Sequence, residues 1–352
     1  MDGMKFILSP SKLALAGLLL AGAFVTSAQA AESELETLEP AVPERAVEDN
    51  KGVYSINFEN DIFAGGDNNY TNGFRFSYFS PESEVPSWLE NTANLIPFFA
   101  EEGHKRWGLE IGQNMYTPDN IEVLANQPDD QPYAGWLYGA ATVVSDTGST
   151  LDTFKLTLGM VGPSSMAKGT QQFIHEITDS PDPRGWRYQL KDEPGVIISY
   201  NRKWRALYEI SPFGWGFDIT PQVGGNLGNI YTNATVGAIA RFGRDLPADY
   251  GPPLISPGMG GSDFFIPTRD FGWYIFGGVE GQAVARNIFL DGNTWKDSNS
   301  VDKYPLVGGI QGGIAFTFND TRVAYTHVIR TDQFQGQKDK EQYGALTMSL
   351  RF

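Results

Sequence analysis

Hydrophobic and polar residues alternate along most of the chain after residue 51. In the first such segment, Tyr54, Ile56 and Phe58 alternate with polar side chains. Because neighbouring side chains of a β-strand point to opposite faces, a period of two residues predicts strands. The chain contains twelve segments of this kind: 54–58, 74–78, 107–111, 138–144, 154–160, 196–204, 215–223, 234–242, 271–279, 306–318, 323–329 and 346–352.

The twelve segments predict an all-β fold, a twelve-stranded antiparallel transmembrane β-barrel with a short helix in an extracellular loop. Single-chain bacterial barrels have an even number of strands, each about nine to eleven residues long. The second face of the segments carries Gly, Ser, Thr and Asn, which suits a polar lumen. The terminal residue, Phe352, ends an amphipathic strand, as in outer-membrane barrels. A soluble β-sandwich is the alternative, but its strands would be shorter.

The N-terminal region reads as a secretion signal followed by a spacer. Lys5 and Lys12 precede or begin an apolar run over residues 13–25, and Ala28-Gln29-Ala30 is a cleavage signature. We therefore expect residues 1–30 to be a signal peptide. The alternative, a membrane anchor, would need an apolar run of about 20 residues. Residues 31–50 are acidic and predict a flexible extension, which leaves 51–352 for the barrel.

Composition narrows the possible functions. The chain has 352 residues, with 26 basic and 42 acidic side chains and a formal net charge of −16. An acidic chain repels phosphate backbones, so we expect no nucleic-acid partner. There is no cysteine, which excludes thiol nucleophiles, disulfides and cysteine metal sites. Aromatic residues make up 13% of the chain, as expected of a barrel with aromatic girdles.

Strand order assigns the connections to the two sides of the membrane. If the N-terminus lies in the periplasm, every odd-numbered connection faces the exterior. These external connections are 60–70, 116–135, 162–194, 224–231, 285–304 and 332–341. The even-numbered connections then face the periplasm. One of them, 80–104, is unusually long and contains a candidate for a short interfacial helix.

The first external connection carries oxygen donors. Glu59, Asn60 and Asp61 follow one another at the end of the first strand. Carboxylate, amide and backbone oxygens are the ligands that calcium prefers. A polar loop rich in turn-forming residues is the alternative, since Gly65-Gly66 and Asn68-Asn69 follow closely.

The longest external connection, 162–194, predicts a helix that ends before Pro181 and Pro183. Gln171 and His175 are four residues apart and therefore share one helix face. Met166, Phe173, Ile174 and Ile177 fit one apolar stripe at helical spacing. An isolated histidine is more often structural than catalytic. The other two, His104 and His327, fall in the 80–104 connection and within a strand.

Three short motifs resemble the outer-membrane lipid A 3′-O-deacylase family (LpxR type). They are END…YTNG, PYAGW, and a Q-x-x-x-H pair followed by GW, and they span residues 54–204. The resemblance implies a calcium-dependent carboxylic ester hydrolase in the outer membrane of a Gram-negative bacterium. Its substrate would be an acyl ester of lipid A, in lipopolysaccharide of the outer leaflet. It further implies contacts with outer-membrane lipids and the barrel-assembly machinery, and a monomer.

The resemblance also assigns residues. The family's required positions match Asn60, Asp61, Thr71, Gln171 and His175. His175 would then be the general base, Gln171 and Thr71 would position groups, and calcium, held by Asp61, Asn60 and Glu59, would stabilise the oxyanion. Lys168, Arg184, Arg187 and Lys191 would contact lipid A phosphates, unless they are only solvated surface residues.

The chain departs from the family at one required position and in its long 80–104 connection. The family has a glutamate six residues after the histidine, where this chain has Pro181, and Glu176 and Glu193 are the candidate substitutes. A non-catalytic barrel, either a narrow channel or a structural surface protein, therefore stays open as an alternative. So does an esterase that acts on phospholipid.

Overall fold

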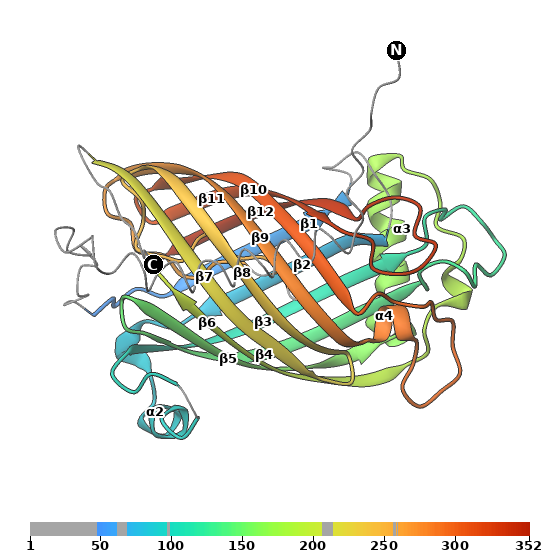
Figure 1. The fold of residues 1–352 in the computed structure, drawn as a ribbon, viewed down its shortest axis with the longest axis horizontal. Helices are drawn as coiled ribbons and strands as arrows, with labels where there is room; N and C mark the ends of the chain where they lie inside the picture. The colour runs from blue at the N-terminus through green and yellow to red at the C-terminus, as the bar shows by residue number, and fades with distance from the viewer. Residues whose placement is uncertain (1–47, 62–68, 97–98, 206–213, 256–257, 259) are drawn as a thin grey trace, which may run out of the picture.

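The protein is a closed barrel of twelve antiparallel strands, each paired with its neighbours in sequence, with β1 paired to β12 (Figure 1). This computed structural model describes residues 48–61, 69–96, 99–205, 214–255, 258 and 260–352. The predicted barrel and its twelve strands are confirmed. The predicted signal peptide, 1–30, and residues 31–47 of the predicted extension lie outside the described residues.

The strands are β1 (Val53–Asn60), β2 (Asn69–Phe79), β3 (His104–Thr117), β4 (Ala134–Asp146), β5 (Thr150–Val161), β6 (Glu193–Trp204), β7 (Trp215–Gly228), β8 (Tyr231–Arg244), β9 (Phe271–Asn287), β10 (Leu306–Phe318), β11 (Thr321–Arg330) and β12 (Gln342–Arg351). The helices are η2 (Glu82–Glu84), α2 (Ser87–Ala93), η3 (Pro163–Ser165), α3 (Ala167–Thr178), η4 (Trp186–Tyr188) and α4 (Ile288–Asp291). None of the helices among the described residues is long and apolar enough to cross a membrane.

Side chains alternate between the lumen and the outer surface, as the sequence pattern predicts. On β1, Tyr54 and Ile56 point outward and are 42% and 45% exposed. The alternate residues, Ser55 and Asn57, are buried inside the barrel. An apolar outer face and a polar inner face are what a barrel wall in lipid requires.

The connection from β8 to β9, described at residues 245–255, 258 and 260–270, folds back into the lumen and occupies much of it. Asn57 Nδ2 donates a hydrogen bond of 3.2 Å to the carbonyl of Pro253. Arg75 forms an ion pair of 2.6 Å with Asp263. We call this segment the lumen plug. Strand order placed this connection on the periplasmic side, but the alternation did not predict that it enters the barrel.

Buried ion pairs hold the lumen plug to the wall. Asp249, on the plug, is fully buried and pairs with Arg322 of β11 at 2.5 Å. Its other carboxylate oxygen pairs with Arg241 of β8. Arg241 also binds Asp218 of β7, with Nε donating to Oδ1 at 2.8 Å. One plug carboxylate therefore links two wall strands that are not neighbours.

The described part of the long connection between β2 and β3, residues 80–96 and 99–103, lies at the opposite rim from α3 (Figure 1). It contains the predicted short helix, which is α2. Ala93 and Phe99 pack on Val143 of β4. Asp49, which falls in the predicted flexible extension, is buried nearby and accepts hydrogen bonds from Arg106 and Arg351 at 2.5 and 2.7 Å. The chain is therefore attached to the barrel before β1 begins.

We expect Asp249→Ala to destabilise the barrel, because it leaves Arg241 and Arg322 without their shared buried carboxylate. Breaking a buried ion pair costs about 3–5 kcal/mol. The check is urea unfolding in lipid vesicles, followed by tryptophan fluorescence. Asp320→Ala, which removes a half-exposed carboxylate at the rim, serves as the control and should cost less than about 1 kcal/mol. Equal losses in the two variants would contradict a structural role for the plug.

Candidate active site

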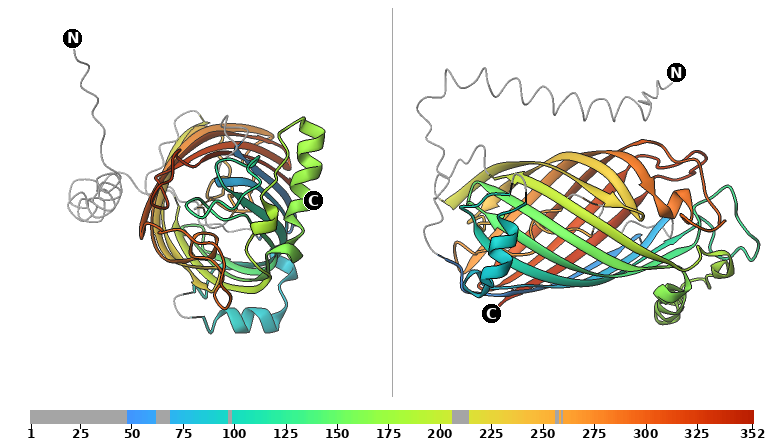
Figure 2. Two further views of the ribbon diagram at one scale, coloured as in Figure 1. Left: turned by 90° about the vertical axis from the view of Figure 1, so that its right-hand side faces the viewer. Right: turned by 90° about the horizontal axis from the view of Figure 1, so that it is seen from below.

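Helix α3 lies outside the barrel wall at one rim and runs across the long axis of the barrel (Figures 1 and 2). Its barrel-facing side carries Ala167, Gln171 and His175, which are 1%, 2% and 5% exposed. Ala167 packs with Met115 of β3, and with Ile121, Tyr133 and Trp186 from the rim loops. The predicted shared face of Gln171 and His175 is confirmed, and it is turned toward the wall.

The predicted apolar stripe of α3 does not face the barrel as a unit. Of its four members only Ile174 packs toward the barrel, where it is partly buried. Met166, Phe173 and Ile177 are 62%, 63% and 68% exposed. The helix therefore turns Gln171 and His175 toward the protein while the large apolar residues Phe173 and Ile177 face away from it, unlike the pattern of a helix on a water-soluble domain.

The outer ends of β1 and β2 supply a second group of buried polar residues. Ser55, Asn57 and Glu59 bond to the lumen plug, so alternation directs Asn60 to the outer surface. Asn60, Thr71 and Asn72 are 3–4% exposed. Outward-facing residues farther along the same strands are far more open; Phe74, for example, is 44% exposed. The wall is therefore covered at this rim.

Strand pairing places this group next to the part of the wall that α3 covers. Asn60 pairs with Asn72 of β2, and Asn72 pairs with Met115 of β3, which packs against α3. Two strand spacings amount to about 10 Å. Thr71 also reaches β3, since its hydroxyl bonds to that of Thr117 at 2.7 Å. The structure thus gathers four of the predicted residues, Asn60, Thr71, Gln171 and His175, on the outside of one stretch of wall.

The ring of His175 is held by a backbone carbonyl. Its Nδ1 lies 2.6 Å from the carbonyl oxygen of Pro181. A carbonyl oxygen only accepts hydrogen bonds, so the contact requires a proton on Nδ1, and in the neutral ring the lone pair is then on Nε2. The chain reverses after α3 because Asp179 adopts a left-handed conformation with φ 54° and Ser180 N bonds to His175 O. This reversal returns Pro181 to the ring.

Neither candidate substitute for the missing glutamate contacts the His175 ring through an interaction that the structure shows. Glu193 accepts hydrogen bonds from Asn229, Asn293 and Thr294 in neighbouring rim loops. Glu176 is exposed on α3. The acceptor at the imidazole is therefore the main chain of Pro181, the position at which the resemblance implied a glutamate.

Gln171 is oriented by a residue that the sequence analysis did not single out. The indole nitrogen of Trp186 donates to Gln171 Oε1 at 2.7 Å. The amide nitrogen of Gln171 is buried and has no hydrogen-bond partner among the described residues. Asn72 Nδ2 is also buried and has no hydrogen-bond partner among the described residues. Two amide donors are thus available on this side of the wall. The GW motif was the sequence signal that could have identified Trp186.

Asp61 and Glu59 are both predicted metal ligands, and both are buried. Asp61 follows β1 directly and is 1% exposed. Glu59 points into the lumen, where its Oε1 accepts a hydrogen bond of 2.7 Å from Ile255 N of the plug. The structure therefore does not bring Glu59 to the side of the wall that Asn60 faces. Within the described ranges, no three His, Asp or Glu side chains form a metal-binding group.

The four predicted substrate-binding residues are exposed. Lys168 lies on α3, whereas Arg184, Arg187 and Lys191 follow it in the same connection. Arg187 Nη2 donates to Leu124 O at 2.8 Å and the guanidinium lies over the Tyr188 ring. The others present their charges to solvent near the rim.

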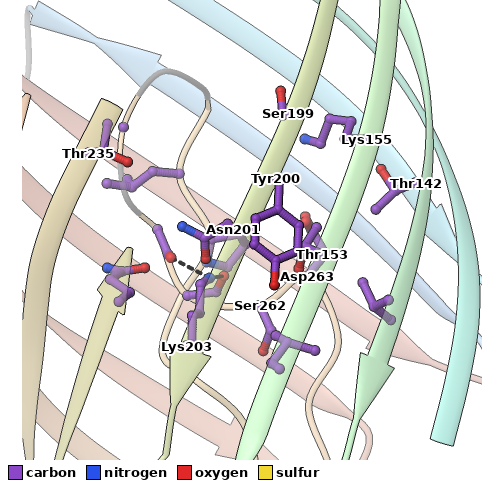
Figure 3. Close-up of a pocket in the computed structure, with 18 of the residues that line it drawn as sticks. Thr142, Thr153, Lys155, Ser199, Tyr200, Asn201, Lys203, Thr235, Ser262 and Asp263 are labelled. Carbon is purple, nitrogen blue, oxygen red and sulfur yellow. Dashed lines mark hydrogen bonds between the residues drawn. The ribbon is translucent and has the colours of Figure 1, made fainter. Parts of the chain in front are cut away.

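A polar cavity of about 120 Å³ lies inside the barrel, between the wall and the plug (Figure 3). Lys155 and Lys203 reach into it from β5 and β6, and Ser262 and Asp263 from the plug. It is separated from α3 by the wall itself. It therefore belongs to the plugged lumen and not to the candidate site.

Comparisons with known proteins agree with the fold. A family model described as "Outer membrane protein LpxR" matches residues 15–352. The solved structure of LpxR from Salmonella typhimurium superposes with a TM-score of 0.68 at 17% sequence identity, covering 85% of this chain and 100% of that one. The β-domain of the Bordetella autotransporter BrkA gives a TM-score of only 0.43 at 12% identity, covering 86% and 100%. No curated protein matches the sequence significantly.

We expect Trp186→Phe to loosen α3 without unfolding the barrel. The substitution keeps an aromatic ring but leaves Gln171 Oε1 buried without its donor. An unsatisfied buried group costs about 1–3 kcal/mol, so amide hydrogens of α3 should exchange roughly 5- to 150-fold faster. Hydrogen exchange with mass spectrometry measures this. Trp295→Phe, at a residue that is 66% exposed, is the control. Unchanged amide exchange in Trp186→Phe would show that the Trp186–Gln171 hydrogen bond does not stabilise α3.

Proposed function

Because the chain belongs to the LpxR family of outer membrane proteins, we propose that it is a lipid A deacylase that hydrolyses an acyl ester of lipopolysaccharide. One observation carries the proposal. His175 and Gln171 of α3 are both buried between the helix and the outer side of the barrel wall. A site in that position opens toward lipid and not toward the lumen. The lumen plug, in turn, argues against the alternative of a channel.

His175 is proposed as the general base through Nε2. Since Nδ1–H is engaged by the Pro181 carbonyl, the lone pair of Nε2 is the one available to accept a proton. In the first step Nε2 takes a proton from water, and the water oxygen forms a bond to the ester carbonyl carbon. In the second step the imidazolium returns the proton to the departing alkoxide oxygen as the C–O bond breaks. The products are a free fatty acid and a hydroxyl group.

Gln171 is proposed to donate to the oxygen that becomes negative. Its amide nitrogen is buried, unpartnered among the described residues and held in one orientation by Trp186. A donor fixed in advance needs no rearrangement as charge develops, and such donors contribute about 10²- to 10³-fold in rate. Thr71, whose hydroxyl already bonds to Thr117, would position the substrate or the attacking water.

Calcium fits the chemistry of the residues at the end of β1. Asp61 offers a carboxylate and Asn60 an amide oxygen, and both residues are buried. Calcium takes six to eight oxygen ligands, among which backbone carbonyls and water are common. Asp61 and Asn60 would hold the ion together with such oxygens. When bound, the ion would supply positive charge beside the ester carbonyl.

The exposed basic residues suit a phosphorylated substrate. Lys168, Arg184, Arg187 and Lys191 all belong to the connection that carries α3, on the solvent side of the site. Lipid A carries phosphates on its sugars, at the level of the headgroups. Contacts from Lys and Arg to these phosphates would hold the sugar at the rim while the acyl ester lies below.

We expect His175→Ala to abolish deacylation while the barrel still assembles. Removal of a general base lowers the rate by about 10²- to 10⁴-fold. The measurement is mass spectrometry of lipid A from cells that produce each variant, in which an active enzyme causes a fixed loss of mass. His104→Ala, on the opposite rim, is the matched control. Acyl release by His175→Ala would exclude His175 as the base. Unchanged lipid A with the wild type, and loss of acyl chains from phospholipid instead, would favour the phospholipid alternative.

We expect Asp61→Asn to raise the calcium concentration needed for half-maximal activity by at least about tenfold, because calcium affinity depends on ligand charge. Deacylation by the purified protein in calcium buffers measures this. Glu59→Gln separates the two predicted ligands, since Glu59 points into the lumen, and should shift the requirement by less than about threefold. A larger shift with Glu59→Gln would return that residue to the ligand set. Full activity in a calcium chelator would refute calcium dependence.

A further inference from the structure

We propose that α3 is an interfacial helix whose exposed apolar residues, Met166, Phe173 and Ile177, contact the acyl chains of outer-leaflet lipids. We call these three residues the lipid stripe. The inference concerns where the helix sits, which does not depend on the reaction. Its consequence for the substrate rests on the proposed function.

Residue exposure divides α3 into three faces. At 3.6 residues per turn, Phe173 and Ile177 fall on one side of the helix, and the exposed Met166 is its N-cap residue. The barrel-facing side carries Gln171 and His175. The remaining side consists of exposed polar residues, namely Lys168, Gln172 and Glu176. The lipid stripe and the polar face therefore flank the barrel-facing side in opposite directions.

This division matches a helix that lies in a membrane surface. Interfacial helices bury an apolar face at the boundary of the acyl chains and keep a charged face in water. The axis of α3 crosses the long axis of the barrel, as Figure 1 shows, so it runs along the membrane plane. In that orientation one of its two exposed faces must point toward the bilayer core and the other away from it.

The wall beneath the helix identifies lipid as the occupant of the stripe. α3 packs on β3 and β4. The outer face of β3 carries Leu109 and Ile111, which are 52% and 57% exposed and belong to the lipid-facing belt of the barrel. Three large apolar side chains at the rim extend this belt onto the helix. Lipid explains why the apolar stripe continues the apolar belt of β3 and why the opposite exposed face of α3 is polar. A protein partner would explain neither.

The consequence is a site whose depth is fixed by lipid contact. Gln171 and His175 share the helix with the stripe, so the position of the stripe in the leaflet sets their level relative to the substrate. Ester groups of lipid A lie near the headgroup boundary, where an interfacial helix sits. The stripe would also line the path by which an acyl chain reaches the site from the bilayer.

Spin labels can locate the stripe directly, since the chain contains no cysteine. Phe173→Cys, Ile177→Cys and the control Gln172→Cys would each be labelled with a nitroxide and reconstituted in phosphatidylcholine vesicles. Oxygen is concentrated in the bilayer and a nickel chelate in water. We expect labels at positions 173 and 177 to collide mainly with oxygen, and the label at 172 mainly with the chelate. Labels at 173 and 177 that behave like the one at 172 would overturn the inference.

An activity measurement then tests the consequence. The double variant Phe173→Ser/Ile177→Ser loses apolar contact, so its deacylation of lipid A in vesicles should fall by at least about tenfold. In detergent micelles, where depth is not imposed, the loss should be less than about twofold. Gln172→Ser/Glu176→Ser is the control. Equal losses in both media would refute the depth argument. If spin labels place the stripe in lipid but the wild type releases no acyl chain, the proposed function fails and the interfacial helix stands.

Discussion

The alternation of side chains across a wall one residue thick decides what each part of this chain can do. Glu59 and Asn60 are neighbours, yet Glu59 bonds to the lumen plug while Asn60 faces outward. A slip of one residue in register would exchange every such pair. On β1 the register is fixed from inside, because Ser55, Asn57 and Glu59 all bond to the plug. The inside of the barrel thus determines which residues reach the lipid side.

The filled lumen suits a protein that works on its outer surface. Asp249 joins Arg241 and Arg322, and Arg75 joins Asp263, so charges that would line a channel are used to connect plug and wall. A transport protein needs an open path, whereas a site built on the wall needs a floor that does not flex. Burying charges is costly unless they are paired, and here the pairs join the plug to the wall across the lumen. The plug therefore holds from inside the same wall that carries the candidate site on its outside.

The sequence predicted what depends on periodicity and missed what depends on packing. Strand number, strand order and the shared face of Gln171 and His175 follow from spacings of two and four residues. The plug has no period, because Pro and Gly interrupt residues 245–270, so nothing in its pattern distinguished it from a surface loop. The apolar stripe of α3 was recognised, but its direction was not. Hydrophobicity alone does not tell a face that packs on protein from one that meets lipid.

The Pro181 carbonyl supplies one of the two effects that a carboxylate would have at the imidazole. It fixes the tautomer and the orientation of His175, because it accepts from Nδ1 at 2.6 Å. Proline has no backbone N–H, so its main chain presents only an acceptor. A carbonyl carries no net charge, however, and stabilises a developing imidazolium less than a carboxylate does. If His175 is the base, as we propose, charge stabilisation during hydrolysis would come more from the Gln171 amide and from a cation at the end of β1 than from the partner of the histidine.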